Sequence, residues 1–304
     1  MMFYRTDILA DLGLDVPKTW DELLALIPIL QFNNMEIGMS QDYTMYMYQL
    51  DGHLWADDGM RINLDANRSL ESFETMCNMF TQYSLPVSYD FANRFRTGEM
   101  PVGVASYTLY NQLKVFAPEI SGLWEFVQLP GVEKADGSIN HTTPVTVGAV
   151  MMMKDAADDI SADQDYTDSR RAQNSWKYLQ WWVSTDTQAR FGKEQVAIMG
   201  TAAKYNTANS KALISQSWTA QEKKNLSQQF RSLKGTPMSP GNYIVARYTN
   251  FAFYNVVDGG EVASEAMLGY VDDINNELTR KREEYNFLTI DEYKAGLEAA
   301  NNAE

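Results

Sequence analysis

Aromatic and polar side chains gather at three places in the chain where helices or strands are expected to begin. Flat aromatic faces bind the apolar C–H faces of pyranose rings, and Asp, Asn and Arg side chains form paired hydrogen bonds with adjacent hydroxyls. These residue types are therefore candidate contacts for a carbohydrate. In chain order the candidates are Asp42, Tyr43 and Tyr46; Tyr107, Tyr110 and Asn111; and Arg247, Tyr248, Phe251 and Phe253.

Each candidate also has an alternative role in packing, because aromatic side chains at helical spacing are more often part of a core. Packing is the favoured interpretation for Tyr46, and for Phe251 and Phe253 the two roles are evenly balanced. Tyr107 is the better candidate, since it follows an expected strand at the point where open α/β sheets bind ligands. Arg247 could equally form a surface ion pair. A further aromatic set is assigned to helix packing: Trp176, Trp181 and Trp182.

The sequence lacks the patterns of known catalytic and metal sites. His53 and His141 have no partners at metal or triad spacing, and no nucleophile elbow, phosphate loop or dinucleotide fingerprint is present. The acidic residues between 155 and 165 do not have the ligand spacing of a calcium loop. Cys77 is the one cysteine, on an apolar helix face, so we expect a small buried side chain and no internal disulfide. We expect no catalysis, no cofactor and no metal.

Charge and composition narrow the class of partner. The chain has 304 residues, 25 Lys and Arg against 40 Asp and Glu, and a formal net charge of −15. Such a surface repels phosphate backbones, so we expect no nucleic-acid partner. The longest apolar run, residues 145–153, is about half the length of a membrane span and predicts a buried strand.

The helices and strands that would position the candidates begin with residues 2–22. This opening stretch predicts a short strand, a helix of one to two turns that ends at Gly13, and a bend at Pro17. Thr19 and Glu22 form a capping box, which predicts that a longer helix begins here and that Trp20 lies in its first turn.

Helices and strands alternate along the rest of the chain, which favours an α/β fold. Residues 131–143 are expected to form a loop or hairpin, and residues 235–241, rich in Gly and Pro, a crossing between lobes. The expected helices are 19–32 (kinked or split at Pro28), 43–50, 69–83, 90–96, 106–116, 169–184, 219–233, 243–257 and 260–285. The expected strands are 35–39, 100–105, 124–129 and 144–153.

Five short motifs follow one another along the chain. They are Tyr-Arg-Thr-Asp-Ile-Leu (4–9), Val-Pro-Lys-Thr-Trp-Asp-Glu-Leu (16–23), Phe-Arg-Thr-Gly-Glu-Met (95–100), Val-Gln-Leu-Pro-Gly (127–131) and Ser-Thr-Asp-Thr-Gln (184–188). In their order and spacing, over nearly all of its length, the chain resembles the family 1 extracellular solute-binding proteins of carbohydrate ABC importers, the maltose-binding-protein-like group.

The resemblance implies a periplasmic-binding-protein-like (type II) fold of two lobes that close around a sugar. Residues 1–129 and 241–304 would form the C-terminal lobe, and residues 130–240 the remaining part of the N-terminal lobe. It also implies capture of a sugar or oligosaccharide for ABC permease subunits, with no catalysis. The location would be the extracellular face of the cytoplasmic membrane or the periplasm, as a lipoprotein in the full-length form.

Residue by residue, the resemblance places Asp42 and Tyr43 near an acidic–aromatic pair of the cleft and Tyr107 in its aromatic platform. Phe251 or Phe253 would lie near a second cleft aromatic. Position 107 is Tyr where maltodextrin-binding relatives have Trp, so the identity of the sugar does not carry over.

Members of the family carry a leader and most of the N-terminal lobe before the opening motif. We therefore expect this chain to lack most of that lobe and to bind sugar weakly or not at all by itself. Residues 130–240 should then expose apolar surface, or be completed by a partner chain, by a swapped dimer, or by further residues.

Two other classes of protein remain open. One is a stand-alone protein-interaction or adhesin-like lobe. The other is a glycoside hydrolase that uses Asp42 with a second carboxylate, although the sequence offers no convincing pair.

Overall fold

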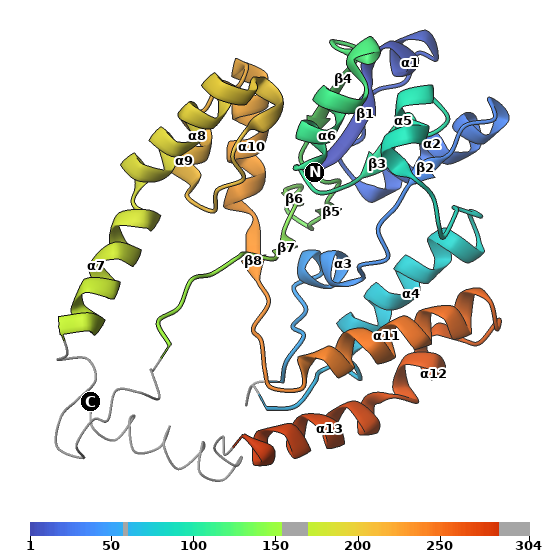
Figure 1. Cartoon of the computed structure of the whole chain (residues 1–304). Helices are drawn as coiled ribbons and strands as arrows, with labels where there is room; N and C mark the ends of the chain where they lie inside the picture. Colours follow the sequence, from blue (N-terminus) through green and yellow to red (C-terminus); the bar gives the residue numbers. More distant parts are fainter. Residues whose placement is uncertain (57–59, 154–169, 286–304) are drawn as a thin grey trace, which may run out of the picture.

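The computed structural model describes residues 1–56, 60–153 and 170–285, in which short strands and longer helices alternate (Figure 1). The strands are β1 (Met2–Arg5), β2 (Ile37–Gly38), β3 (Val102–Val104), β4 (Trp124–Val127), β5 (Val132–Glu133), β6 (Ile139–Asn140), β7 (Thr143–Val145) and β8 (Leu233–Gly235). The helices are α1 (Thr6–Asp11), α2 (Trp20–Phe32), α3 (Thr44–Gln49), α4 (Asn67–Thr81), α5 (Phe91–Thr97), α6 (Leu109–Phe116), α7 (Arg170–Val183), α8 (Thr185–Met199), α9 (Ser210–Ile214), α10 (Ala220–Arg231), α11 (Asn242–Val257), α12 (Ala263–Leu268) and α13 (Val271–Glu284). Among the described helices, none is long and apolar enough to cross a membrane.

The largest sheet in the described residues, called the central sheet below, is a four-stranded mixed sheet of order β2-β3-β1-β4. β1 runs antiparallel to both β3 and β4, and β2 runs parallel to β3. Every residue of β1 is buried, and successive side chains enter opposite faces: Met2 and Tyr4 join one apolar cluster and Phe3 the other. A strand buried on both faces needs apolar side chains, which Met2, Phe3 and Tyr4 supply; the buried charge of Arg5 at the end of the strand is paired with Asp7 at 2.6 Å.

The opening stretch folds as the sequence predicts. Gly13 has a positive φ of 64° after α1, and Thr19 and Glu22 form a capping box at the start of α2. Tyr4 and Trp20 are buried, with exposed fractions of 8% and 5%. α2 continues through Pro28 as one helix, so the proline does not split it.

The expected strand over residues 144–153 is wrong beyond Val145. β7 pairs in parallel with β8, and the register ends where Val145 meets Gly235. The described residues offer no strand alongside the rest of the run, which is extended into solvent. Val150 and Met151, for example, are 60% and 72% exposed.

The prediction of one helix over residues 260–285 is also wrong. α12 ends at Leu268, and α13 begins at Val271. The break lets the two helices pack separately, α12 on α4 and α11 and α13 on α11, while the Tyr270 ring between them lies 4.9 Å from the Tyr248 ring.

Residues 130–240 form a hairpin (β5–β6), the parallel pair β7–β8, and the helices α7 to α10. The hairpin confirms one of the two structures expected for residues 131–143. α10 packs on the central sheet: the Asn225 side chain donates to the Phe126 carbonyl at 2.8 Å, and Leu226 joins the cluster that holds Phe126.

In Figure 1, α7 lies apart from this sheet, at the left of the view. Trp176 and Trp181 are each 54% exposed, so their assignment to helix packing is wrong, whereas the expected exposure of apolar surface in this part of the chain is confirmed.

Candidate functional site

The first group of candidates lies at the start of α3. The Asp42 carboxylate accepts a hydrogen bond from the Thr44 backbone N–H at 3.0 Å and remains partly exposed. Tyr46, by contrast, is 1% exposed, and its hydroxyl donates to the Met79 sulfur. Tyr46 therefore serves the core, which is the role that its helical spacing favours.

Tyr43 combines burial with an unused hydrogen-bonding group. Its ring meets the edge of Phe73, with centroids 5.9 Å apart, and only 5% of the residue is exposed. The hydroxyl is buried and has no hydrogen-bond partner in the described part of the chain. Burial, with the nearby Asp42 carboxylate, raises the pKa of Tyr43 well above its ordinary value. The hydroxyl therefore stays protonated and can donate a hydrogen bond.

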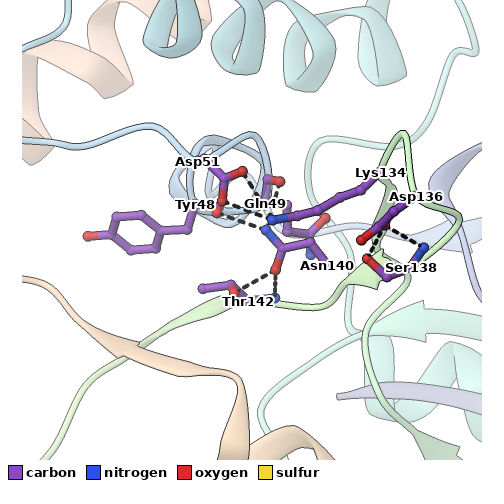
Figure 2. A network of polar contacts seen from close by, with 8 residues as sticks. All are labelled: Tyr48, Gln49, Asp51, Lys134, Asp136, Ser138, Asn140 and Thr142. Carbon is purple, nitrogen blue, oxygen red and sulfur yellow. Dashed lines mark hydrogen bonds and ion pairs between the residues drawn. The ribbon is translucent and has the colours of Figure 1, made fainter.

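The end of α3 is fastened to the segment that enters residues 130–240, as Figure 2 shows. The Asn140 side chain donates to the backbone carbonyls of Gln49 and Tyr48, at 2.8 and 3.3 Å. The Gln49 side chain in turn donates to the Pro130 carbonyl at 3.1 Å, and Lys134 forms an ion pair of 3.1 Å with Asp51. The C-terminal end of α3 is thus hydrogen-bonded to the first crossing segment, which leads from β4 into residues 130–240.

The second crossing segment, which leads back from residues 130–240 to α11, contacts the same helix. The Tyr48 hydroxyl lies 3.0 Å from the Thr236 hydroxyl, and the Lys234 ammonium lies 4.5 Å from the centroid of the Tyr48 ring. Nearby, the Trp55 indole donates to the Pro237 carbonyl at 2.9 Å. α3 therefore lies between both segments that connect residues 130–240 to the rest of the chain.

The second group begins just after β3, as its sequence position predicts, but its side chains are occupied by protein. The Tyr107 hydroxyl bonds the Asn206 side chain, and the Asn111 amide donates to the Lys204 carbonyl at 2.7 Å. Tyr110 is buried, and its hydroxyl accepts a hydrogen bond of 2.8 Å from the Lys204 ammonium.

Lys204 is a buried cation held among aromatic rings. Its ammonium lies 4.2 Å from the Tyr110 ring centroid and 3.9 Å from that of Trp218. Burial is the largest cause that lowers the pKa of Lys204, to about 8, and the Lys114 charge adds to it; the Glu222 carboxylate acts in the opposite direction.

The third group, on α11, divides between core and surface. Phe253 is 2% exposed and packs edge-on against Phe80 at 5.1 Å, so it belongs to the core. Tyr248 is half-buried against Tyr270. Phe251, at 46% exposure, and Arg247 reach solvent.

The sequence gives little indication of the residues that join these groups. Asn140 belongs to an Asn-x-Thr triplet of a kind that occurs by chance, and Gln49 and Lys204 are single polar residues in unremarkable contexts. Their roles arise from partners about 90 residues away along the chain. The Gly- and Pro-rich composition of residues 235–241 is the sequence feature that indicates the second crossing segment.

Acidic and histidine side chains are the groups that a metal site or a catalytic triad would use. Within residues 1–56, 60–153 and 170–285, no three His, Cys, Asp or Glu side chains gather in a way that could hold a metal ion. His141 contacts the Leu129 carbonyl and His53 lies 3.4 Å from the Lys234 ammonium, so neither belongs to a triad in this part of the chain.

Comparison with known proteins gives a family match and a set of similar structures. The model of the family described as bacterial extracellular solute-binding protein matches residues 1–222. Among curated protein sequences, none matches this chain.

Three solved structures illustrate the structural similarity. The sugar-binding protein MalE of Xanthomonas citri has a TM-score of 0.66 at 18% identity, with 95% of this chain and 71% of that chain covered. An ABC transporter solute-binding protein of Thermotoga lettingae, bound with α-D-tagatose, has a TM-score of 0.63 at 17% identity, with 91% of this chain and 70% of that chain covered. The cyclic α-maltosyl-1,6-maltose binding protein of Arthrobacter globiformis has a TM-score of 0.66 at 13% identity, with 91% of this chain and 69% of that chain covered. At these identities the similarity establishes the fold.

Proposed function

Because this chain belongs to the bacterial extracellular solute-binding proteins, we propose that it captures a sugar or oligosaccharide for import by an ABC transporter. The observation that carries the proposal is the family match over residues 1–222, which includes the first two candidate groups. The similar structures support a sugar as the ligand class, since they are described as binding tagatose, maltose-type sugars or oligosaccharides.

The ligand contacts that we propose are those whose groups remain available. Asp42 supplies a partly exposed carboxylate, and Tyr43 beside it supplies the buried hydroxyl that lacks a partner. Arg247 and Phe251 supply an exposed cation and an exposed ring on α11. Tyr107 would join them once it exchanges its bond with Asn206 for a sugar hydroxyl. A carboxylate, tyrosine hydroxyls, a cation and a ring together match the recognition chemistry of a pyranose.

The proposed mechanism is closure of two lobes about the crossing segments. In this proposal residues 1–129 and 241–304 belong to one lobe and residues 130–240 to the other, which contacts the first lobe through α10 in the arrangement described above. A sugar that contacts both lobes favours the closed arrangement, since its full set of bonds forms only there. α3, which is bonded to both crossing segments, is positioned to couple ligand contact at its start to lobe movement at its end.

The protein would act outside the cytoplasmic membrane, anchored as a lipoprotein in its full-length form, and would deliver the sugar to permease subunits. We propose binding without turnover, because no pair of carboxylates at hydrolase spacing is evident among the candidates. An unchanged sugar after prolonged incubation, measured by mass spectrometry, is the expected result.

Saturation-transfer NMR with a panel of tagatose, maltose, maltotriose and a cyclic maltose tetrasaccharide tests the proposal, since this method also detects weak binding. We expect saturation of ring protons for at least one sugar and none for an uncharged polyol of similar size. Transfer to no sugar in the panel would reject capture of these four sugars by the 304 residues alone.

A further inference from the structure

Residues 204–206 join the region of α8 and α9 to α6, and we refer to them as the bridging segment. Its attachment to α8 and α9 uses neighbouring backbone and hydroxyl groups. The Tyr205 N–H donates to the Gln216 side chain at 2.9 Å, and the Tyr205 carbonyl accepts from the same side chain at 2.8 Å. Just after the segment, the Thr207 hydroxyl donates to the Gln188 side chain of α8 at 2.8 Å. None of these bonds involves α6.

The attachment to α6 uses the other two residues of the bridging segment. The Asn111 amide donates to the Lys204 carbonyl at 2.7 Å, and the Tyr107 hydroxyl bonds the Asn206 side chain. The Lys204 ammonium donates to the Tyr110 hydroxyl at 2.8 Å. The contact with α6 can therefore break while the bonds to α8 and α9 remain.

Lys204 makes this contact costly as long as it carries its charge. The residue is 5% exposed, and its ammonium forms no ion pair within the described residues. The rings of Tyr110 and Trp218 compensate in part, with centroids 4.2 and 3.9 Å from the ammonium. A buried cation without a carboxylate partner costs free energy relative to the same cation in water.

The charged groups around Lys204 come from three helices. Burial is the largest cause of its low pKa, about 8 instead of 10.5; the Glu222 carboxylate of α10 raises it, and the Lys114 charge of α6 lowers it. The charged side chains of α8 are all exposed: Asp186, Arg190, Lys193 and Glu194. The neighbouring Tyr107 and Tyr110 keep their protons, because burial raises the pKa of both.

We propose that the bridging segment makes a proton-controlled contact with α6, which loosens when Lys204 is protonated and tightens when Lys204 is neutral. In the released segment Lys204 lies in water and has its ordinary pKa, so release is accompanied by uptake of a proton. Release therefore becomes rarer as the pH rises from about 8 to 10.5. It also frees the Tyr107 hydroxyl. The consequence for a sugar rests on the proposed function, whereas the contact itself does not.

Limited proteolysis of the purified chain tests the contact. Trypsin must take a Lys or Arg side chain into its own pocket, so the bond after Lys204 is cut only when the bridging segment leaves α6. Mass spectrometry gives the initial rate of this cut, which is divided by the rate for a free peptide of residues 200–208. We expect this ratio to fall about tenfold from pH 7 to pH 9.

Lys204→Arg is the matched control, because it keeps the cleavage site but does not lose its proton in this range. Its ratio should be the same at both pH values. Asn111→Ala removes one bond to the bridging segment and should raise the ratio about threefold to tenfold. Gln112→Ala, at the exposed next position of α6, should leave it unchanged.

Unfolding of the whole chain would also expose Lys204, so the cut is repeated in low concentrations of urea. A local release exposes little surface, and its frequency should not change with urea. Three results would overturn the proposal: a ratio that is constant with pH in the wild type, the same tenfold fall in Lys204→Arg, or a cut that accelerates with urea as unfolding does.

Binding of a sugar tests the link to Tyr107. A sugar bonded to this hydroxyl requires the released segment, so its affinity should be about tenfold lower at pH 9 than at pH 7, and equal at both in Lys204→Arg. Equal affinities in the wild type would refute this link. Absence of binding by any sugar at either pH would count against the proposed function, and the proteolysis result would stand without it.

Discussion

At the scale of single residues, two buried polar groups distinguish this protein. The Tyr43 hydroxyl has no partner among the described residues, and the Lys204 ammonium is enclosed by aromatic rings. Burying a polar group without full compensation costs free energy. Each group therefore gives a measurable signature in the stability of the protein.

Removal of the Tyr43 hydroxyl should stabilise the free protein. In Tyr43→Phe the free energy of unfolding is expected to rise by about 1 kcal/mol, since an unsatisfied buried group is lost. Tyr89→Phe is the matched control: its hydroxyl donates to the Met39 carbonyl at 2.7 Å, so the same change should cost about 1 kcal/mol. Urea denaturation of both variants measures the two opposite signs.

The same substitution should weaken sugar binding if Tyr43 donates to the ligand. Loss of one hydrogen bond predicts an affinity about threefold to tenfold lower, with the Tyr89 variant unchanged. If Tyr43→Phe and Tyr89→Phe lost equal stability and bound sugar equally well, the Tyr43 hydroxyl would have a protein partner instead.

Lys204 should make stability depend on pH above neutrality. Its pKa falls from an ordinary value of 10.5 to about 8 in the folded protein, mainly through burial, so between these values the unfolded chain holds the extra proton. Stability attributable to this residue therefore rises as the pH goes from about 8 to 10.5. The free-energy difference between wild type and Lys204→Met should shift in favour of wild type by up to roughly 3 kcal/mol from pH 7 to pH 10. A difference that stays constant in denaturant titrations over this range would contradict the assignment.

At the scale of elements, the central sheet has a gap that one ring fills. Gly38 of β2 and Gly103 of β3 are register partners, and a Cβ on either would overlap the Phe91 ring. Phe91 opens α5, so the missing side chains let this helix approach the sheet closely.

Gly103→Ala should therefore destabilise the protein by about 1–3 kcal/mol through overpacking. Gly235→Ala in β8 is the control, because a Cβ there meets nothing within 4 Å, and its effect should stay within about 0.5 kcal/mol. Thermal denaturation of both variants, and of Gly103→Ala in a Phe91→Ala background, gives the test. An undiminished cost without the ring would show that the Gly38 carbonyl oxygen, 3.0 Å from such a Cβ, rather than Phe91 is responsible.

Elements governed by local signals could be predicted from the sequence, and those that depend on distant partners could not. The capping box at Thr19 and the turn at Gly13 act within a few residues, and both occur as expected. The run 145–153 has the composition of a buried strand, but a strand also needs neighbours, and the paired register stops at Gly235.

The candidate site follows the same division. The place of Tyr107, after β3, could be read from the junction of strand and helix. Its bond with Asn206 joins residues 99 apart in the chain, and no local pattern encodes such a contact. The burial of Tyr46 and Phe253 agrees with their helical spacing, which favoured core packing for Tyr46 and balanced it evenly against ligand contact for Phe253.

At the scale of the whole molecule, stability should be unevenly distributed. The central sheet has apolar clusters on both faces, whereas β7–β8 is an isolated pair and α7 buries a single described residue. Local opening costs little free energy where few apolar contacts are broken.

Hydrogen exchange of the purified chain should show this difference. We expect amides of α7 to exchange orders of magnitude faster than those of β1 and β3, because opening α7 exposes little new apolar surface. Mass spectrometry of peptic peptides from residues 1–11, 98–108 and 172–184 measures it. Equal protection in all three peptides would mean that α7 is covered in the isolated chain.

Two tryptophan N–H groups are linked to the crossing segments, one through the Gln49 side chain and one directly. The Trp20 indole donates to the Gln49 side chain, which itself bonds the Pro130 carbonyl, and the Trp55 indole donates to the Pro237 carbonyl. Indole N–H resonances are resolved from backbone amides in a nitrogen-15 NMR spectrum and shift when their acceptors move. The protein thus contains two native spectroscopic probes, one for each crossing, through which lobe movement could be followed without attaching a label.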